Sequence, residues 1–255
     1  MKTAIIDLAY LVSAVLFIFG LKRMQSPVTA RTGNMLASSG MLVAVVATLF
    51  LYEILSWPMI LAGVVLGGGI GVWLARTVEM TSMPELVAVF NGFGGLASAL
   101  VAGAEISQYV EGTAIELEPF NAVGALTVGI SILIGTITFS GSIVANGKLS
   151  GWLSGNPTSF PGMRVLTGLL LLGSIAGIGM MMVEAGRFPE PAFPTVYAAT
   201  GLGSAALVLG ILLVIPIGGA DMPVVVALLN SYSGLAASAT GFVLDNTALI
   251  VSGTL

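Results

Sequence analysis

The fold is decided by the stretch Asp221–Gly241, DMPVVVALLNSYSGLAASATG. Its length suits a membrane-spanning helix, which needs roughly 20 apolar residues to cross about 30 Å of hydrocarbon. Asn230 lies near the middle of the stretch, and Asp221 stands at its entrance. An amide in lipid is costly unless it has a partner, so polar residues inside the membrane are functional candidates. The stretch therefore predicts a membrane helix that carries a polar site.

A second copy of this stretch occurs earlier in the chain. The matched residues are Met83-Pro84, Val87-Ala88, Asn91 and Gly95-Leu96-Ala97 against Met222-Pro223, Val226-Ala227, Asn230 and Gly234-Leu235-Ala236. Convergent packing of small residues would explain part of this match. Two equivalent amides on two equivalent helices nevertheless predict a shared polar site between the helices.

Composition places the chain in a membrane. Of its 255 residues, 56% are hydrophobic and 8% are charged, whereas soluble domains carry roughly 25% charged residues. Cysteine and histidine are absent from the sequence, which excludes thiol chemistry and removes the commonest proton carrier near neutral pH. No metal site is expected, and the net charge of −4 gives no sign of nucleic-acid binding.

Hydropathy predicts an all-α fold, a polytopic transmembrane helix bundle with eight full spans and a partial ninth. The full spans are expected near 4–21, 34–52, 58–75, 84–104, 122–145, 164–183, 196–217 and 222–244. The ninth begins near Thr247, and the chain stops at Leu255, too soon to cross a bilayer. We interpret 1–255 as a single transmembrane domain, truncated before a further C-terminal domain.

The lysine and arginine residues of the short loops predict the orientation. Lys22, Arg23, Arg31, Arg76, Lys148 and Arg164 fall on one side of the expected spans, and Lys2 and Arg187 fall on the other. The first side is expected to be cytoplasmic. This places the N-terminus outside and the missing C-terminal domain in the cytoplasm.

Three of the expected spans carry small or polar stripes at helical spacing. They are Asn91, Gly95, Ser98, Ala102 and Glu105; Thr127, Ser131, Gly135, Thr138 and Ser142; and Asn230, Gly234, Ala237 and Gly241. If the stripes face one another, their amides and hydroxyls could conduct a proton with the help of water. Interhelical hydrogen bonding alone would also explain them. Asp221 would stand at the cytoplasmic mouth, as a helix cap favoured by the dipole or as a coupling point.

Three blocks of the sequence carry a family resemblance: MPVVVALLNSYSGLAASATGF from Met222, MPELVAVFNGFGGLASALV from Met83, and FSGSIVANGKLSG from Phe139. They resemble the β subunit of proton-translocating NAD(P) transhydrogenase. The resemblance implies hydride transfer from NADH to NADP⁺, coupled to inward proton movement. It also implies that this fragment binds no nucleotide and catalyses no hydride transfer alone. The NAD(H) domain would belong to the α polypeptide, and the NADP(H) domain would follow the membrane spans.

The resemblance implies site residues as well. Asn230 matches an asparagine of the proton path, and Asp221 matches an acidic residue that communicates with the NADP(H) domain. Ser142 matches a channel-lining serine, with Ser140 as a second match. Asn91 departs from the family pattern, because many members have a histidine there that is proposed as the central proton carrier. The carrier would then come from a partner subunit, or conduction would run through water and amides.

The implied partners are the α subunit with its NAD-binding domain and membrane helices, a second copy of the whole complex, and the lipid of a bacterial inner membrane. Two alternatives come from other classes of protein. A secondary transporter would favour inverted repeats or two halves with broken helices, and the sequence shows neither. A structural membrane subunit would not need two amides on matched faces.

Overall fold

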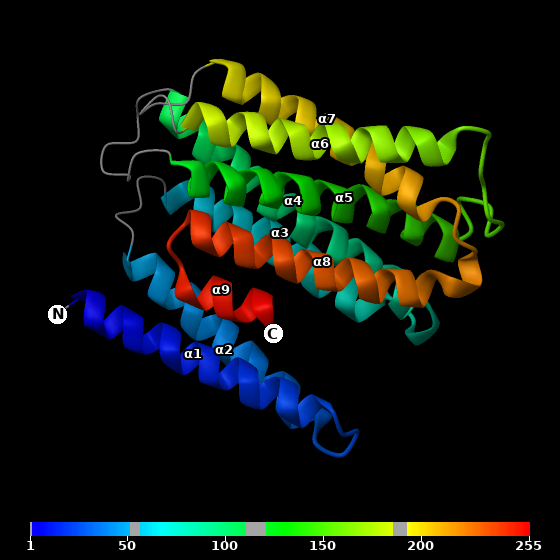
Figure 1. The fold of residues 1–255 in the computed structure, drawn as a ribbon. Coiled ribbons are helices and arrows are strands. Elements are labelled where there is room, and N and C mark those ends of the chain that lie inside the picture. Colours follow the sequence, from blue (N-terminus) through cyan, green and yellow to red (C-terminus); the bar gives the residue numbers. More distant parts are fainter. Residues whose placement is uncertain (1, 52–56, 111–120, 186–192) are drawn as a thin grey trace. The chain divides into compact units, whose positions relative to one another are not determined.

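The structure is a computed structural model that describes residues 2–51, 57–110, 121–185 and 193–255. Within these residues every regular element is a helix (Figure 1). The α-helices are α1 (Lys2–Met24), α2 (Ala30–Leu51), α3 (Trp57–Thr77), α4 (Met83–Val110), α5 (Ala122–Leu149), α6 (Met163–Ala185), α7 (Phe193–Val214), α8 (Met222–Val243) and α9 (Thr247–Thr254). Eight of them are long and apolar enough to cross a membrane. The predicted all-α membrane bundle is confirmed, and α9 occupies the place of the partial ninth span.

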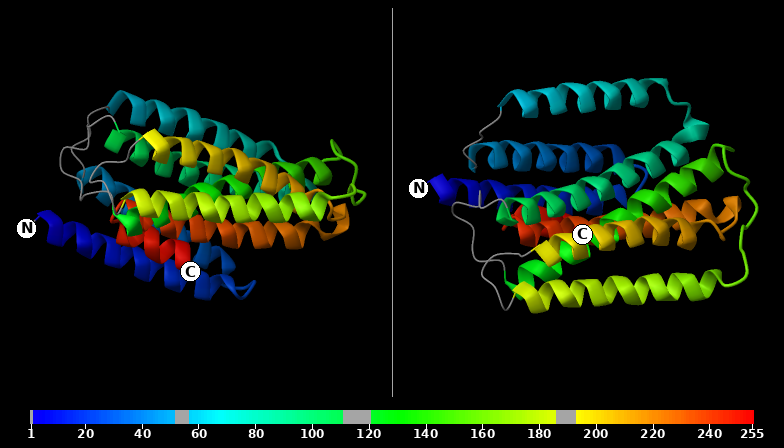
Figure 2. Two further views of the ribbon diagram at one scale, coloured as in Figure 1. Left: turned by 45° about the horizontal axis from the view of Figure 1, so that its top comes forward. Right: turned by 90° about the horizontal axis from the view of Figure 1, so that it is seen from above.

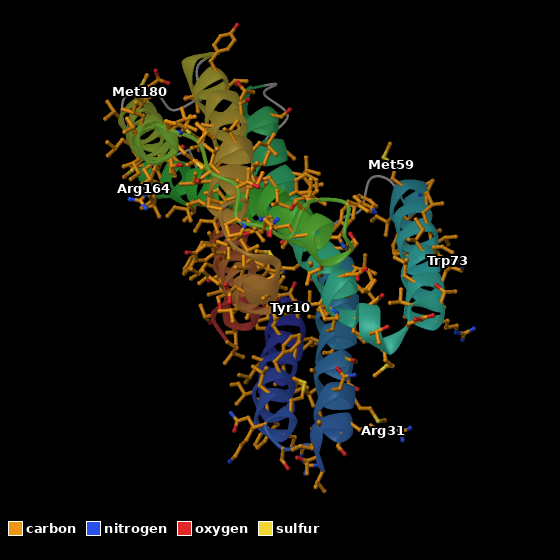
Figure 3. All side chains as sticks on the ribbon, turned by 90° about the vertical axis from the view of Figure 1, so that its right-hand side faces the viewer. Tyr10, Arg31, Met59, Trp73, Arg164 and Met180 are labelled. Carbon is orange, nitrogen blue, oxygen red and sulfur yellow. The ribbon has the colours of Figure 1, made fainter. Side chains whose placement is uncertain are left out.

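The described residues form two compact units, Met1–Met80 with Leu255 and Thr81–Thr254. The prediction of one transmembrane domain stays a prediction, and each unit is considered by itself. In the first unit α1 packs along α2, where the Tyr10 Oη and the Thr48 Oγ1 lie 3.0 Å apart. Helix α3 buries none of its residues, and Trp73 projects outward from it (Figure 3).

Helix α5 forms the centre of the second unit, because it packs against α4, α6, α7 and α8. Helices α4 and α8 also touch each other, so that α4, α5 and α8 form a mutually packed trio, and α9 folds back along α8 (Figure 2). This trio consists of the three helices on which the sequence shows polar stripes. The three spans that carry the stripes are therefore neighbours in the second unit.

Glycines set the close approach of α4 to α5. A Cβ atom added at Gly95 would lie 2.6 Å from the Gly135 carbonyl oxygen, and one added at Gly135 would lie 2.5 Å from the Gly95 carbonyl oxygen. The two backbones are thus in direct contact, as small residues allow in membrane helices. This contact brings the polar side chains on either side of it within hydrogen-bonding reach.

The two copies of the sequence repeat begin in the same way. A short 3₁₀ turn, η1 (Met80–Ser82) or η2 (Gly219–Asp221), leads into the Met-Pro start of α4 or α8. Proline is tolerated in the first helical turn because its missing N–H would have no partner there. The match in sequence therefore extends to the local backbone.

Candidate functional site

Asn91, Ser142 and Ser233 form a hydrogen-bonded group, which we call the amide–hydroxyl cluster, between α4, α5 and α8. The Ser233 Oγ donates to the Asn91 Oδ1 at 2.7 Å, and the Asn91 Nδ2 donates to the Ser142 Oγ at 3.0 Å. Asn91 is 7% exposed and Ser142 is fully buried. The two hydrogen bonds give a partner to both the oxygen and the nitrogen of the Asn91 amide, as a buried polar group requires. The structure thus brings Asn91 and Ser142 together, and their part in a proton path stays a prediction.

Further hydroxyl groups continue from this cluster along α5. Ser131, Thr138 and Ser142 share one face of the helix and are all fully buried. The Thr240 Oγ1 of α8 lies 3.3 Å from the Ser131 Oγ. The Thr138 Oγ1 is buried and has no hydrogen-bond partner among the described residues. Buried polar groups are normally satisfied by protein or water, so the Thr138 hydroxyl is an exception among the described residues.

Asn230 does not join the cluster, and this corrects the expected arrangement of α8. Its side chain is exposed within the described structure. The stripe that begins at Asn230 turns toward α9 instead, because a Cβ added at Gly234 would meet the Gly253 carbonyl oxygen at 2.7 Å. At about 100° per residue, the face with Ser233 and Thr240 is roughly a quarter turn away from this stripe. The helix is therefore rotated relative to the sequence-based expectation.

Ser140 also lies apart from the cluster. It is buried, but it stands nearly opposite Ser142 around α5. Its Oγ donates within its own helix to the carbonyl oxygen of Thr136 at 3.1 Å. The space beside it is taken by α7, since a Cβ added at Gly210 would collide with the Ser140 Oγ. The structure therefore gives Ser140 a place in the contact between α5 and α7.

Asp221 ends η2 and immediately precedes α8, in the position of its N-cap. Its side chain is exposed and makes no capping hydrogen bond. Ser233 lies twelve positions further on, which is about 18 Å along a helix axis. The carboxylate is thus available at the surface and separate from the amide–hydroxyl cluster.

Lys148 stands behind the connector that leads to Asp221. Its Nζ donates to the carbonyl oxygens of Ile215 at 2.6 Å, Ile217 at 2.7 Å and Asn156 at 3.1 Å. The residue is 5% exposed, although it carries a cation. Backbone hydrogen bonds, such as that from the Gly219 N–H to the Gly155 oxygen at 2.8 Å, join the same two loops. Lys148 therefore fixes the connector between α7 and α8, with Asp221 at its end.

Sequence reasoning missed two of these residues. Ser233 lies three positions after Asn230, so helical spacing could have identified it as well. The polar site was assigned to Asn230 because its amide is the larger polar group. Lys148 entered the sequence-based prediction only as one of the charges that set the orientation of the spans in the membrane. Its three carbonyl partners lie in two separate loops, and no local pattern predicts them.

The described residues do not fit a dinucleotide cofactor. The glycine-rich run Gly67–Gly71 lies inside the long helix α3. A dinucleotide fingerprint must follow a strand and open a helix, so that its backbone N–H groups face the pyrophosphate. Within the described residues there is no strand to precede such a turn, and no group of His, Cys, Asp and Glu could hold a metal ion.

Comparison with known proteins agrees with this arrangement. The model of a family described as NAD(P) transhydrogenase beta subunit matches residues 6–255. Two relatives from Rhodospirillum rubrum, both named NAD(P) transhydrogenase subunit beta, are 40% identical to the chain over 248 residues. The match covers 97% of this chain and 51% of each relative, so the chain spans about half the length of the curated relatives it matches. With its membrane helices and its match over almost the whole length, this integral membrane chain belongs to the NAD(P) transhydrogenase beta subunit family.

Proposed function

We propose that this chain supplies part of the membrane proton path of a proton-translocating NAD(P) transhydrogenase. In that enzyme hydride transfer from NADH to NADP⁺ would be coupled to inward proton movement. The observation that carries the proposal is the amide–hydroxyl cluster of Asn91, Ser142 and Ser233, buried between three membrane helices. A contact that only held the helices together would not need further buried hydroxyls. Here they continue along α5 and α8 beyond the amide–hydroxyl cluster.

The cluster has a direction that suits a water-mediated path. The Ser233 hydroxyl donates to the Asn91 oxygen, and the Asn91 amide donates to the Ser142 oxygen. The proton of the Ser142 hydroxyl remains available for a water in the line. Amides and hydroxyls can orient water in this way, although they do not carry charge themselves at neutral pH.

The exposed amide of Asn230 indicates a partner subunit. Asn230 lies on the surface of α8, and an amide in lipid is costly without a hydrogen-bond partner. We propose that it faces the membrane helices of an α subunit, where it adjoins the proton path. The complete enzyme would act as a twofold assembly, because closed dimers are the commonest symmetry, and would reside in a bacterial inner membrane.

The cofactors of the complete enzyme would be NAD(H) and NADP(H), and both would lie outside this chain. Asp221 is placed to communicate with the NADP(H) domain, because its carboxylate is exposed at the end of a connector that Lys148 fixes. This chain's part in the reaction is to orient water and to move protons, and hydride transfer takes place elsewhere.

The test uses the complete α and β complex in sealed vesicles. Asn91→Leu is expected to abolish proton-coupled turnover and to spare a cyclic reaction that exchanges hydride without net proton movement. The matched control is Asn34→Leu, the same change at an exposed amide of α2. The proposal fails if the wild-type complex moves no protons during transhydrogenation, or if Asn91→Leu pumps at the wild-type rate.

A further inference from the structure

Helix α4 buries a carboxyl group on the same face as the amide–hydroxyl cluster. Glu105 is only 8% exposed in the structure. It lies fourteen positions after Asn91, which is about 21 Å along the axis and close to the same angle around the helix. A buried ionisable side chain in a membrane span is costly and is by default a functional candidate.

The surroundings of Glu105 continue the face that packs on α5. Asn91, Ser98 and Ala102 precede it on that face, and all three are buried. Ala102 belongs to the same apolar cluster as Val128 of α5. Glu105 therefore stands beyond the Ser131 hydroxyl on the side away from Asn91, at the end of α4 opposite to its Met-Pro start.

Few other titratable groups lie on the helices that contact α4. Helix α5 carries only Lys148, at its opposite end, and α8 carries only Tyr232. Helix α7 carries only Tyr197, whose side chain is 71% exposed. Glu85 lies on α4 itself but in its first turn. In this half of the bundle Glu105 is thus the only carboxyl group on the packed faces of α4, α5, α7 and α8.

We propose that Glu105 is the protonatable group of the outer half of the proton path and exchanges protons between the outer water and the hydroxyl line of α5. This proposal rests on the proposed function and names a carrier that the chain itself supplies. The step is a proton transfer only. An O–H bond forms on the carboxylate as the donor water loses its proton, and the same bond breaks when the proton passes to a water in the line.

The buried hydroxyl of Thr138 supports this assignment from a separate observation. The Thr138 Oγ1 has no partner among the described residues, and it lies on the α5 face between Ser131 and Ser142. Successive hydroxyls on that face are about 6–10 Å apart along the axis, too far for direct transfer. Water at Thr138 would bridge the line, and a carboxyl group at its outer end could deliver protons to that water.

The experiment compares Glu105→Gln with wild type in the complete complex, in sealed vesicles. Glutamine keeps the shape of the side chain and removes its titratable proton. We expect proton-coupled turnover to fall on the order of 10²-fold, as for loss of a proton-transferring group, while the cyclic reaction stays within about twofold of wild type. Glu105→Asp is expected to restore part of the coupled rate.

Glu184→Gln is the matched control. Its carboxylate lies at the same end of the bundle on α6, but it accepts a hydrogen bond from the Thr195 Oγ1 of α7 at 2.9 Å. Infrared difference spectra give a readout that a structural role would not change. A carboxyl C=O band that accompanies turnover should vanish in Glu105→Gln and persist in Glu184→Gln.

The outcomes separate the two proposals. If wild type couples protons to hydride transfer and Glu105→Gln does so at the same rate, the role of Glu105 is wrong and the proposed function stands. If wild type shows no coupling, the proposed function itself fails. Equal loss of the coupled and cyclic reactions in Glu105→Gln, with no change in the carboxyl band, would also overturn the carrier role in favour of a structural one.

Discussion

The side chains of Asn91 and Ser142 are joined at 3.0 Å across the contact between α4 and α5, fifty-one positions apart in the sequence. The contact is possible because Gly95, about one turn from Asn91, and Gly135, about two turns from Ser142, bring the two backbones together. The hydrogen-bonded pair and the glycine pair thus depend on the same close approach of α4 and α5. The first two predictions separate their contributions.

The first prediction concerns the strength of the polar pair. A double-mutant cycle with Asn91→Ala and Ser142→Ala should give a coupling free energy of about 0.6–1.7 kcal/mol, the range measured for interhelical hydrogen bonds in membranes. Reversible unfolding in detergent measures it. A matched cycle of Asn91→Ala with Ser140→Ala should give no coupling, because Ser140 lies on the opposite side of α5. Equal coupling in both cycles would show that the hydrogen bond between Asn91 and Ser142 is not the source of the coupling.

The second prediction concerns the glycine contact. Gly95→Ala is expected to destabilise the bundle by about 1–3 kcal/mol, the usual range for overpacking, because the new methyl group would press on the Gly135 oxygen and on Thr138. Gly103→Ala on the same helix is the control, since nothing lies within 4 Å of its added Cβ. It should be neutral or slightly stabilising. Thermal unfolding of the two variants should differ in this order, and the reverse order would contradict the close approach.

The third prediction concerns Lys148. Lys148→Met would leave the carbonyl oxygens of Ile215 and Ile217 without their charged donor. Hydrogen bonds to a charged group contribute about 1.5–3 kcal/mol each, so the connector before Asp221 should loosen. Hydrogen exchange should accelerate at residues 215–221 and in the loop 150–158.

Arg164→Met is the control for the lysine, because Arg164 is an exposed cation at the same end of the bundle (Figure 3). Its hydrogen exchange in the connector should match wild type. If the proposed function holds, Lys148→Met in the complete enzyme should also weaken NADP(H) binding or speed its release, whereas the proposed proton path through Asn91 should still conduct. Unchanged exchange in Lys148→Met would remove the positioning role.

The fourth prediction concerns topology. Trp152 is 81% exposed in the loop after α5, and Thr247 is exposed at the start of α9, at the opposite end of the second unit. The chain has no cysteine, so Trp152→Cys and Thr247→Cys each introduce a single reporter. An impermeant thiol reagent should label Trp152→Cys from the cytoplasm and Thr247→Cys from outside. The opposite pattern would reverse the predicted orientation.

Much of the fold could be predicted because the membrane allows a spanning chain only a few kinds of structure. A chain that crosses hydrocarbon must satisfy its backbone internally, so long apolar runs become helices. The span expected at 222–244 is α8 at Met222–Val243. The largest difference is in α4, which continues to Val110 beyond the expected end at 104. The expected span ends one residue before Glu105, whereas the longer helix includes Glu105.

The rotation of α8 could not be predicted in the same way. In a soluble helix the apolar face identifies the core, but in a membrane both the lipid side and the packed side are apolar. Helix α8 also carries hydroxyls and glycines around much of its circumference, including Ser233, Gly234 and Thr240. The sequence repeat aligns Asn230 with Asn91, and so it predicts equivalent positions for the two amides. Only the packing of α8 against α5 and α9 shows that the two amides face different neighbours.

Lys148 has a consequence for biosynthesis as well as for the folded state. In the bundle its cation is enclosed by three carbonyl oxygens, one from the loop that follows α5 and two from the connector 67 and 69 positions later in the chain. Those loops follow Lys148 in synthesis, so during insertion of α5 the ammonium group is still solvated and can act as an orienting charge at the helix end. The same proton-bearing nitrogen would then change its role as later helices arrive, from a signal that sets which way α5 enters the membrane to a brace for the connector of α8. A lysine with both duties tolerates replacement less readily than the exposed Lys22, whose charge is needed only for the first.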